Sequence, residues 1–218
     1  MRLTWYGHAA FLLETEHPPR RIIMDPFAPE SGYQAINEPA DLVTLSHENL
    51  RFHSHLASVQ GTPAVLQGLT CPPGEQLWEG LPLRAVTVFE NVQHEGPNAI
   101  IKLTVDGLTV THMGDCGHAL DAATLAAIGQ TDVLLALTGG PPTLSLPDLL
   151  DVVERLRPAW IVPMHFRTVP LKLNLLPLEA FLTTFAAYPL RRVGAASVTL
   201  SRADLPAKPT VLILDHAR

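Results

Sequence analysis

Long apolar runs and blocks of like charge are both missing from this chain of 218 residues. No stretch of about 18 consecutive apolar residues occurs, so no membrane-spanning helix is expected. The net charge is −6 and no block of five like charges occurs, which argues against binding of nucleic acid through a basic face. The apolar run 9–13, between His8 and Glu14, is too short for a signal peptide.

Cysteine is scarce as well. Cys71 and Cys116 are too few to build a disulfide framework, and we expect a cytoplasmic protein with both thiols reduced. Apolar residues make up 47% of the chain and charged residues 17%, a balance typical of a globular protein. No linker-like segment divides the chain, so a single domain spanning 1–218 is the simplest interpretation.

Short apolar segments separated by turn residues dominate the first half of the chain. Alternating or fully apolar patterns predict strands over 3–7, 9–15, 21–26, 40–46, 63–67 and 83–90. Proline and glycine predict a loop over 69–82, and a helical turn or two is expected between Phe52 and Val59. Two alternating runs flank Asp106-Gly107, the favoured two-residue hairpin turn, so 98–105 and 108–115 should pair.

The second half alternates between strand and helix patterns. Helices are expected over 121–129, 145–158 and 177–188, and strands over 132–138, 159–165, 195–201 and 210–215. The middle helix has clear end signals, with Ser145 as N-cap, Pro147 in the first turn and Pro158 just past the end. Together the patterns favour two sheets with helices outside.

Polar residues follow five of the predicted strands at the point where each strand ends. They are His8, Asp25, His47, Asp115 and His165. Side chains that converge at strand ends are a common way to build a site, and His with Asp suits Zn, Mn, Fe or Ni. A single histidine at a strand end is more often a surface or capping residue, and Asp25 before Pro26 is typical of a turn. Because all five residues occur in this order at successive strand ends, chance is a weaker explanation for the pattern.

These segments resemble the metallo-β-lactamase fold superfamily, and within it the small hydrolases related to the L-ascorbate-6-phosphate lactonases. The matching stretches are TWYGHAAFLLE (4–14), IIMDPF (22–27), ADLVTLSH (40–47), GPNAIIKLTVDGLTVTHMGDCGH (96–118) and IVPMHFRT (161–168). The resemblance implies an α/β fold, a four-layer αββα sandwich, with a metal site at one edge between the sheets.

The family's signature loop, His-x-His-x-Asp-His, is degenerate here. Its first histidine matches His47, but the remaining ligand positions fall on Asn49, Arg51 and Phe52. Asn is a poor ligand for a transition metal, and Arg and Phe cannot serve. His53 would replace the last histidine if the loop carried one extra residue. We therefore do not expect the family's two-metal site to form.

The resemblance still implies enough ligands for one divalent ion, with Zn or Mn favoured. His47, Asp115 and His165 match family positions, and His8 belongs to the GHA element near the site. His53, Glu90 and His94 are further candidates to complete the set. Asp115 and His165 are also the expected catalytic residues, together with Arg51, whose guanidinium would bind an anionic group of a substrate. The alternative for Arg51 is simple exposure to solvent.

Two functions follow from this incomplete ligand set. The first is a metal-dependent hydrolase of a small lactone, ester or phosphodiester. The second is a catalytically inactive relative that keeps the fold to bind a small ligand or a partner. The expected partner is a small-molecule substrate. Binding to nucleic acid or to a membrane is not expected. The apolar segment 169–178 is either core or a contact in a homo-oligomer.

Overall fold

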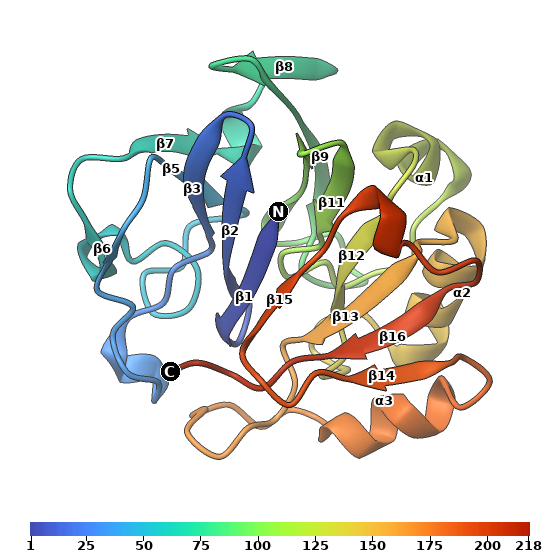
Figure 1. Ribbon diagram of the computed structural model, residues 1–218. Coiled ribbons are helices and arrows are strands. Elements are labelled where there is room, and N and C mark those ends of the chain that lie inside the picture. The colour runs from blue at the N-terminus through green and yellow to red at the C-terminus, as the bar shows by residue number, and fades with distance from the viewer.

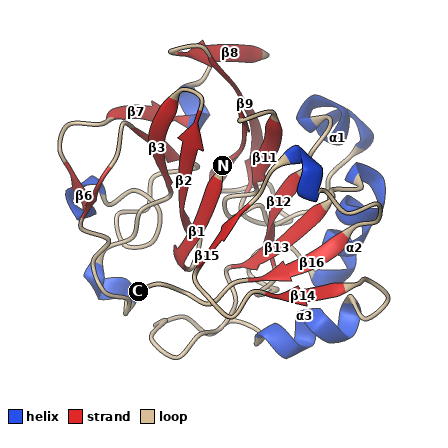
Figure 2. Cartoon of the chain, viewed as in Figure 1, coloured by secondary structure: helices blue, strands red, loops and turns tan.

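Two β-sheets pack face to face in the computed structural model, which describes residues 1–218 (Figure 1, Figure 2). In spatial order, the six-stranded sheet contains β15 (Ser197–Thr199), β1 (Arg2–Gly7), β2 (Ala10–Glu16), β3 (Pro19–Met24), β5 (Leu42–Leu45) and β7 (Ala64–Gln67). The eight-stranded sheet contains β14 (Leu190–Arg192), β16 (Thr210–Ile213), β13 (Trp160–Met164), β12 (Val133–Leu137), β11 (Leu108–His112), β10 (Pro97–Val105), β9 (Leu81–Phe89) and β8 (Glu75–Trp78). A separate short ladder joins β4 (Glu38–Pro39) and β6 (Val59–Gln60).

Both faces of the six-stranded sheet are covered, because successive side chains of a strand point to opposite sides. In β1, Trp5 belongs to the large core of 47 buried residues, to which both sheets contribute. Its neighbour Tyr6 belongs to a second cluster of 13 buried residues, with Ile23 of β3 and Val43 of β5. The predicted strands of the first half are therefore correct in type, and their apolar residues divide between two cores.

Three α-helices lie along the outer face of the eight-stranded sheet (Figure 2): α1 (Ala122–Ile128), α2 (Leu146–Leu156) and α3 (Leu178–Thr184). The predicted start of α2 is confirmed, since the Ser145 hydroxyl accepts a hydrogen bond from the backbone N–H of Asp148. None of the helices is long and apolar enough to cross a membrane. Outside the six-stranded sheet, loops and short 3-10 turns, including 29–31 and 56–58, replace an α-helical layer.

Two edge strands were not predicted from the sequence. β8 lies inside the expected loop 69–82 and pairs antiparallel with β9, so that part of the loop prediction is wrong. β14 pairs parallel with β16 although its three residues are all exposed. Edge strands with little buried surface carry no strong alternation of apolar and polar residues, so the sequence pattern does not reveal them. The helical turn expected within 52–59 is a 3-10 turn over 56–58.

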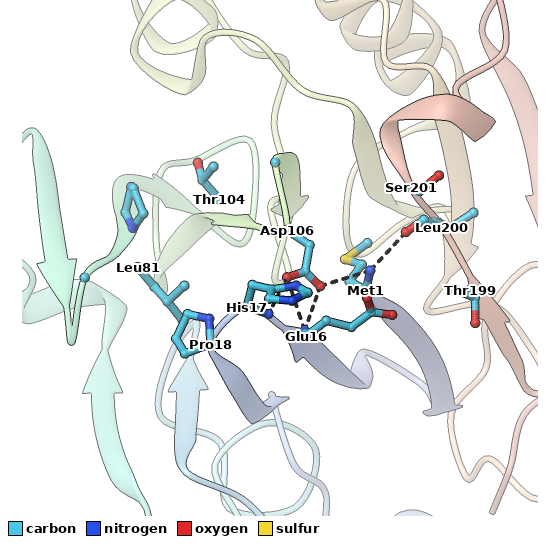
Figure 3. Close-up of a pocket in the computed structure, with 13 residues that line it drawn as sticks. Met1, Glu16, His17, Pro18, Leu81, Thr104, Asp106, Thr199, Leu200 and Ser201 are labelled. Carbon is cyan, nitrogen blue, oxygen red and sulfur yellow. Dashed lines mark hydrogen bonds and ion pairs between the residues drawn. The ribbon is translucent and has the colours of Figure 1, made fainter.

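The turn of the β10–β11 hairpin lies beside the first residue of the chain, with Asp106 next to Met1 (Figure 3). Asp106 and Gly107 have φ angles of 48° and 75°, as the predicted two-residue turn requires. The Asp106 carboxylate accepts hydrogen bonds from the backbone N–H groups of Glu16 and His17 and pairs with the Met1 ammonium at 3.0 Å. These groups border a pocket of about 550 Å³.

The Asp106 contacts predict a pH-dependent contribution to stability. Burial opposes ionisation, but the N–H donors of His17 and Glu16 and the Met1 ammonium outweigh it and lower the pKa of Asp106 below 3.8. We expect Asp106→Asn, which keeps a turn-compatible side chain, to lower the free energy of unfolding by ~1 kcal/mol at pH 7. Because the folded-state pKa is depressed, this contribution is present above about pH 4 and lost on acidification through the folded-state pKa. Urea unfolding of both proteins at pH 7 and pH 3 should show the difference shrinking at pH 3; an unchanged difference would contradict the assignment.

Candidate metal centre

The strands that carry the predicted site residues end at one edge of the sandwich, at the bottom in Figure 1. β1 and β3 run in the same direction because each pairs antiparallel with β2, and β5 is parallel to β3. In the other sheet β9 and β11 both pair antiparallel with β10, and β11, β12 and β13 are parallel. The loops that follow these strands therefore meet between the two sheets, as the sequence predicts.

Four side chains from different loops come together at this edge. One ligand atom from each of His8, His53, Asp115 and His165 lies within 4.8 Å of all the others. His8 and His165 follow β1 and β13 directly and have positive φ angles of 48° and 55°. The backbone N–H of His165 donates to the carbonyl of His8 at 3.0 Å, which joins the two sheets at the site. We call these four residues the four-residue cluster; all four are among the predicted ligands, and His47 is the predicted ligand outside it.

His53 lies between two carboxylates. Its Nδ1 is 2.9 Å from Asp25 Oδ2, and its Nε2 is 3.0 Å from Asp115 Oδ2. Burial lowers the pKa of His53, but the Asp115 and Asp25 carboxylates outweigh it and raise the pKa to about 10. Without a metal, His53 is therefore an imidazolium that neutralises part of the charge of its two partners. The structure therefore brings His53, and not Phe52, into the cluster.

Asp25 connects two histidines of the loop after β5, His47 and His53. Its carboxylate accepts hydrogen bonds from the backbone N–H of Ser46 at 2.8 Å and from the Ser46 hydroxyl at 2.5 Å. The same hydroxyl lies 3.0 Å from His47 Nδ1, so Asp25 helps to orient both His53 and His47. Asp25 has a φ of 45°, in agreement with the turn-forming role expected for it. Its contact with His53 adds a second role that the sequence interpretation did not include.

His47 and Glu90 form the open side of the site. His47 Nε2 lies 4.0 Å from Asp115 Oδ2 and 3.7 Å from Glu90 Oε1. The His47 side chain is 3% exposed, whereas that of Glu90 is 39% exposed. Burial, followed by the charge of Asp115, raises the pKa of the Glu90 carboxyl. His47 therefore borders the four-residue cluster, and Glu90 lies between it and solvent.

The remaining predicted residues lie outside the cluster. Arg51 is exposed, donates from Nε to the carbonyl of Glu30 at 3.2 Å and lies 4.8 Å over the Phe52 ring. Phe52, at a position where the resemblance implies a ligand, packs with its ring centroid 5.2 Å from that of His8. These contacts place Arg51 towards solvent, the alternative weighed for it from the sequence. His94 stacks on Phe89 at 5.1 Å and does not join the cluster.

Two features that hold the site together were not found from the sequence. The buried Asn98 accepts a hydrogen bond from the backbone N–H of Asp115 at 2.9 Å and donates to the carbonyl of Met113 at 3.0 Å. Gly117 and Gly139 lie where a Cβ would come within 1.7 Å of the Glu90 carbonyl and 2.0 Å of the His165 carbonyl, respectively. An asparagine at the start of a strand and a glycine in a loop have no distinctive sequence signal.

The donor atoms of the four-residue cluster fit a divalent metal ion. Both ring nitrogens of His8 and Nδ1 of His165 are buried without a hydrogen-bond partner. Unpaired buried polar atoms are costly, and coordination of an ion is a recognised way to satisfy them. Two atoms bound to one ion at about 2.0–2.2 Å lie within about 4.4 Å of each other, so the cluster needs only a small contraction.

The charge state of the cluster also suits an ion. Burial lowers the pKa of His8 well below 6.5, and the neighbouring His165 and His53 lower it further. Burial opposes ionisation of Asp115, but His53 and His165 hold the pKa of this carboxyl well below its usual range. At neutral pH His8 is therefore an uncharged imidazole and Asp115 a carboxylate, the forms in which both side chains bind metals.

Comparisons with known proteins agree with this fold. Residues 2–165 match the family described as beta-lactamase superfamily domain. A relative from Pyrobaculum arsenaticum, described as a UPF0173 metal-dependent hydrolase, is 27% identical over 195 residues, or 78% of this chain and 86% of the relative. Because the family match spans more than half of the chain, the chain belongs to the β-lactamase superfamily.

Solved structures give the same result. A proposed zinc-dependent hydrolase of the metallo-β-lactamase superfamily from Thermotoga maritima is 33% identical, has a TM-score of 0.77, and the alignment covers 98% of this chain and 97% of that one. An isothiocyanate hydrolase from Delia radicum gut bacteria has a TM-score of 0.66 over 92% of this chain and 99% of that one. At 14% identity the second likeness shows the fold alone.

Proposed function

We propose that the protein is a metal-dependent hydrolase of a small molecule and that it works with a single divalent ion, Zn or Mn. The observation that carries the proposal is the four-residue cluster, in which ligand atoms of His8, His53, Asp115 and His165 all lie within 4.8 Å of one another. Both ring nitrogens of His8 are buried there without a hydrogen-bond partner. The printed description of the Pyrobaculum relative as a metal-dependent hydrolase supports it. On this proposal the protein's substrate is a small lactone, ester or phosphodiester.

Each residue of the site has a separate task in this proposal. A divalent ion, when bound, supplies Lewis acidity, which lowers the pKa of water and polarises the bond under attack. Asp115 and His165 are 3.2 Å apart and would hold the ion from the eight-stranded sheet, while His8 and His53 would hold it from the other side. Glu90 is the most exposed acidic group at the opening, and its raised pKa suits a group that accepts a proton from water.

The positions of His53 and Asp25 also favour a second candidate function. The His53 imidazolium between Asp25 and Asp115 neutralises buried charge without any metal. A chain with this internal cation can keep the fold stable as a binding protein that has lost catalysis. The two candidates differ in whether a divalent ion displaces the proton of His53, and metal binding by the purified protein separates them.

The deciding experiment is metal analysis of protein purified without chelator. We expect about one equivalent of divalent metal per chain and a Tm that falls when a chelator removes it. His165→Ala should lose most of this metal because the variant lacks one ligand of the four-residue cluster. His94→Ala is the matched control, since His94 lies outside the cluster and should leave the metal content unchanged. Metal-free protein with a Tm that does not respond to added Zn or Mn would favour the inactive binding protein.

A further inference from the structure

A pocket of about 430 Å³ lies between the loops that follow β3 and β5. It is lined by Ala28 and Glu30 from the first loop and by Leu50, Arg51 and His55 from the second. None of these residues belongs to the four-residue cluster. The volume suits a small molecule, since ligand pockets commonly measure about 300–1,000 Å³. We call this pocket the Arg51 pocket.

The two loops that form the Arg51 pocket are tied together by backbone hydrogen bonds. The N–H of Ala28 donates to the carbonyl of Arg51 at 3.0 Å, and the N–H of His55 donates to the carbonyl of Pro26 at 2.9 Å. Within the second loop, the three successive N–H groups of 52–54 donate to the carbonyl of Asn49. The backbone therefore fixes the walls, and a ligand would meet a pocket that is already formed.

The Arg51 guanidinium is oriented, but its terminal nitrogens are free. Its Nε donates to the carbonyl of Glu30 at 3.2 Å, and its Cζ lies 4.8 Å from the centre of the Phe52 ring. Arg51 forms no ion pair and its side chain makes no other hydrogen bond. A guanidinium held in this way presents N–H groups in the planar geometry that matches the two oxygens of a carboxylate.

An acidic side chain lines the same pocket. Glu30 is exposed, and its carboxylate forms no hydrogen bond and no ion pair, not even with Arg51. The pocket therefore presents one positive and one negative side chain that do not neutralise each other. A ligand with only a negative charge would be attracted by Arg51 and repelled by Glu30. A ligand that carries one charge of each sign would pair with both.

The remaining lining residues offer an apolar surface and a fixed imidazole ring. Leu50 is 71% exposed, and Ala28 contributes a second apolar wall. His55 Nδ1 lies 2.6 Å from the Ser58 hydroxyl, which holds the ring at the edge of the pocket. Contact with an apolar group of a ligand would remove the Leu50 side chain from water, which is favourable. The pocket therefore suits an apolar group that lies next to two opposite charges.

We propose that the Arg51 pocket binds a zwitterionic α-amino acid with an apolar side chain. The carboxylate of the ligand pairs with Arg51, its ammonium group pairs with Glu30, and its side chain packs on Leu50 and Ala28. The inference goes beyond the proposed hydrolase function and does not depend on it, because the pocket contains no residue of the four-residue cluster. Arg51, expected from the sequence to bind an anionic group of the substrate, binds the anionic group of a separate ligand instead.

Calorimetry on the full chain tests the class of ligand with four probes. They are L-leucine, leucinamide without the carboxylate, 4-methylpentanoate without the ammonium group, and glycine without the apolar side chain. We expect L-leucine to bind at least about 10-fold more tightly than each of the other three, because each lacks one of the recognised groups. Equal binding of L-leucine and 4-methylpentanoate would overturn the inference, since only a carboxylate would then be recognised. Absence of binding of both L-leucine and L-phenylalanine at about 10 mM would also overturn it.

Charge-neutralising variants test whether the ligand lies in the Arg51 pocket. Arg51→Gln should weaken binding of L-leucine at least about 10-fold and leave binding of leucinamide unchanged. Glu30→Gln should weaken binding of L-leucine and bind 4-methylpentanoate no more weakly than the wild-type protein does. The matched controls are Arg167→Gln and Glu179→Gln, which neutralise a base and an acid of another pocket, of about 500 Å³, and should bind L-leucine normally.

All four substituted side chains are exposed, so these variants should keep the fold. Two outcomes would place the ligand elsewhere and overturn the inference. One is a loss of L-leucine binding in a control variant as large as the loss in Arg51→Gln. The other is equal weakening of L-leucine and leucinamide by Arg51→Gln, because leucinamide has no carboxylate for Arg51 to bind.

Discussion

Replacing His53 with alanine is expected to lower the free energy of unfolding of the metal-free protein by about 3–5 kcal/mol, because it leaves buried carboxylates without their counter-charge. His53 is fully buried, and its two ring nitrogens lie 2.9 Å from Asp25 and 3.0 Å from Asp115. Urea unfolding in the presence of a chelator measures the effect. A loss below about 1 kcal/mol would show that the two carboxylates do not depend on His53.

His47→Ala is the matched control, since His47 belongs to the same loop and is also buried. Burial lowers the pKa of His47, so its imidazole is uncharged at neutral pH and its removal leaves no buried charge unpaired. We expect a loss of only about 1–2 kcal/mol from this variant, mainly from the contact with Ser46 and from packing. Equal losses from the two variants would contradict the imidazolium assignment of His53.

The stability that His53 contributes should fall as the pH rises. The pKa of His53 rises from 6.5 in the unfolded chain to about 10 in the folded protein. A raised pKa contributes stability fully below pH 6.5 and loses it as the pH rises through the folded-state value. The difference between the wild-type protein and His53→Ala should therefore be largest near pH 6, decline between pH 6.5 and about 10, and be small above that.

The elements with strong local signals were predictable from the sequence. The Asp106-Gly107 turn, the N-cap at Ser145 and the alternating strands each depend on neighbouring residues, and the structure contains all of them. The helix-poor layer outside the six-stranded sheet was not predictable in the same way. There the cover consists of loop residues such as Phe27, Tyr33 and Phe52, whose burial depends on contacts far along the chain.

The sequence predicted which residues form the candidate site better than it predicted how they are arranged. Strand ends placed His8, Asp115 and His165 at one edge, and the structure brings these three together. Whether His53, Glu90 or His94 completes the ligand set stayed open, because ligand spacing does not reveal the path of a loop. The Asn49 carbonyl, which accepts three backbone N–H groups, sets that path and turns His53 towards Asp115. Asn98 was missed because it acts through the backbone of Asp115.

Gly139→Ala is expected to displace His165 and to weaken metal binding about 10–100-fold, the range observed when groups that orient metal ligands are changed. A Cβ on Gly139 would lie 2.0 Å from the His165 carbonyl and 3.2 Å from Leu175 Cβ, and the first of these contacts is with backbone that has little room to move. The backbone of His165 is held on its other side by the His8 carbonyl, so the strain would act directly on two members of the four-residue cluster. Competition with a chromophoric chelator measures the metal affinity.

General loss of stability has to be separated from displacement of the site in this test. Overpacking at Gly139 should cost about 1–3 kcal/mol, and Leu149→Ala should cost about 2–5 kcal/mol by leaving a cavity under α2. Leu149 is completely buried in the large core and has no part in the four-residue cluster. If the metal affinity depends on the position of His165, it falls in Gly139→Ala and stays within about twofold of the wild-type value in Leu149→Ala. A parallel fall in both variants would mean that affinity follows the stability of the whole fold.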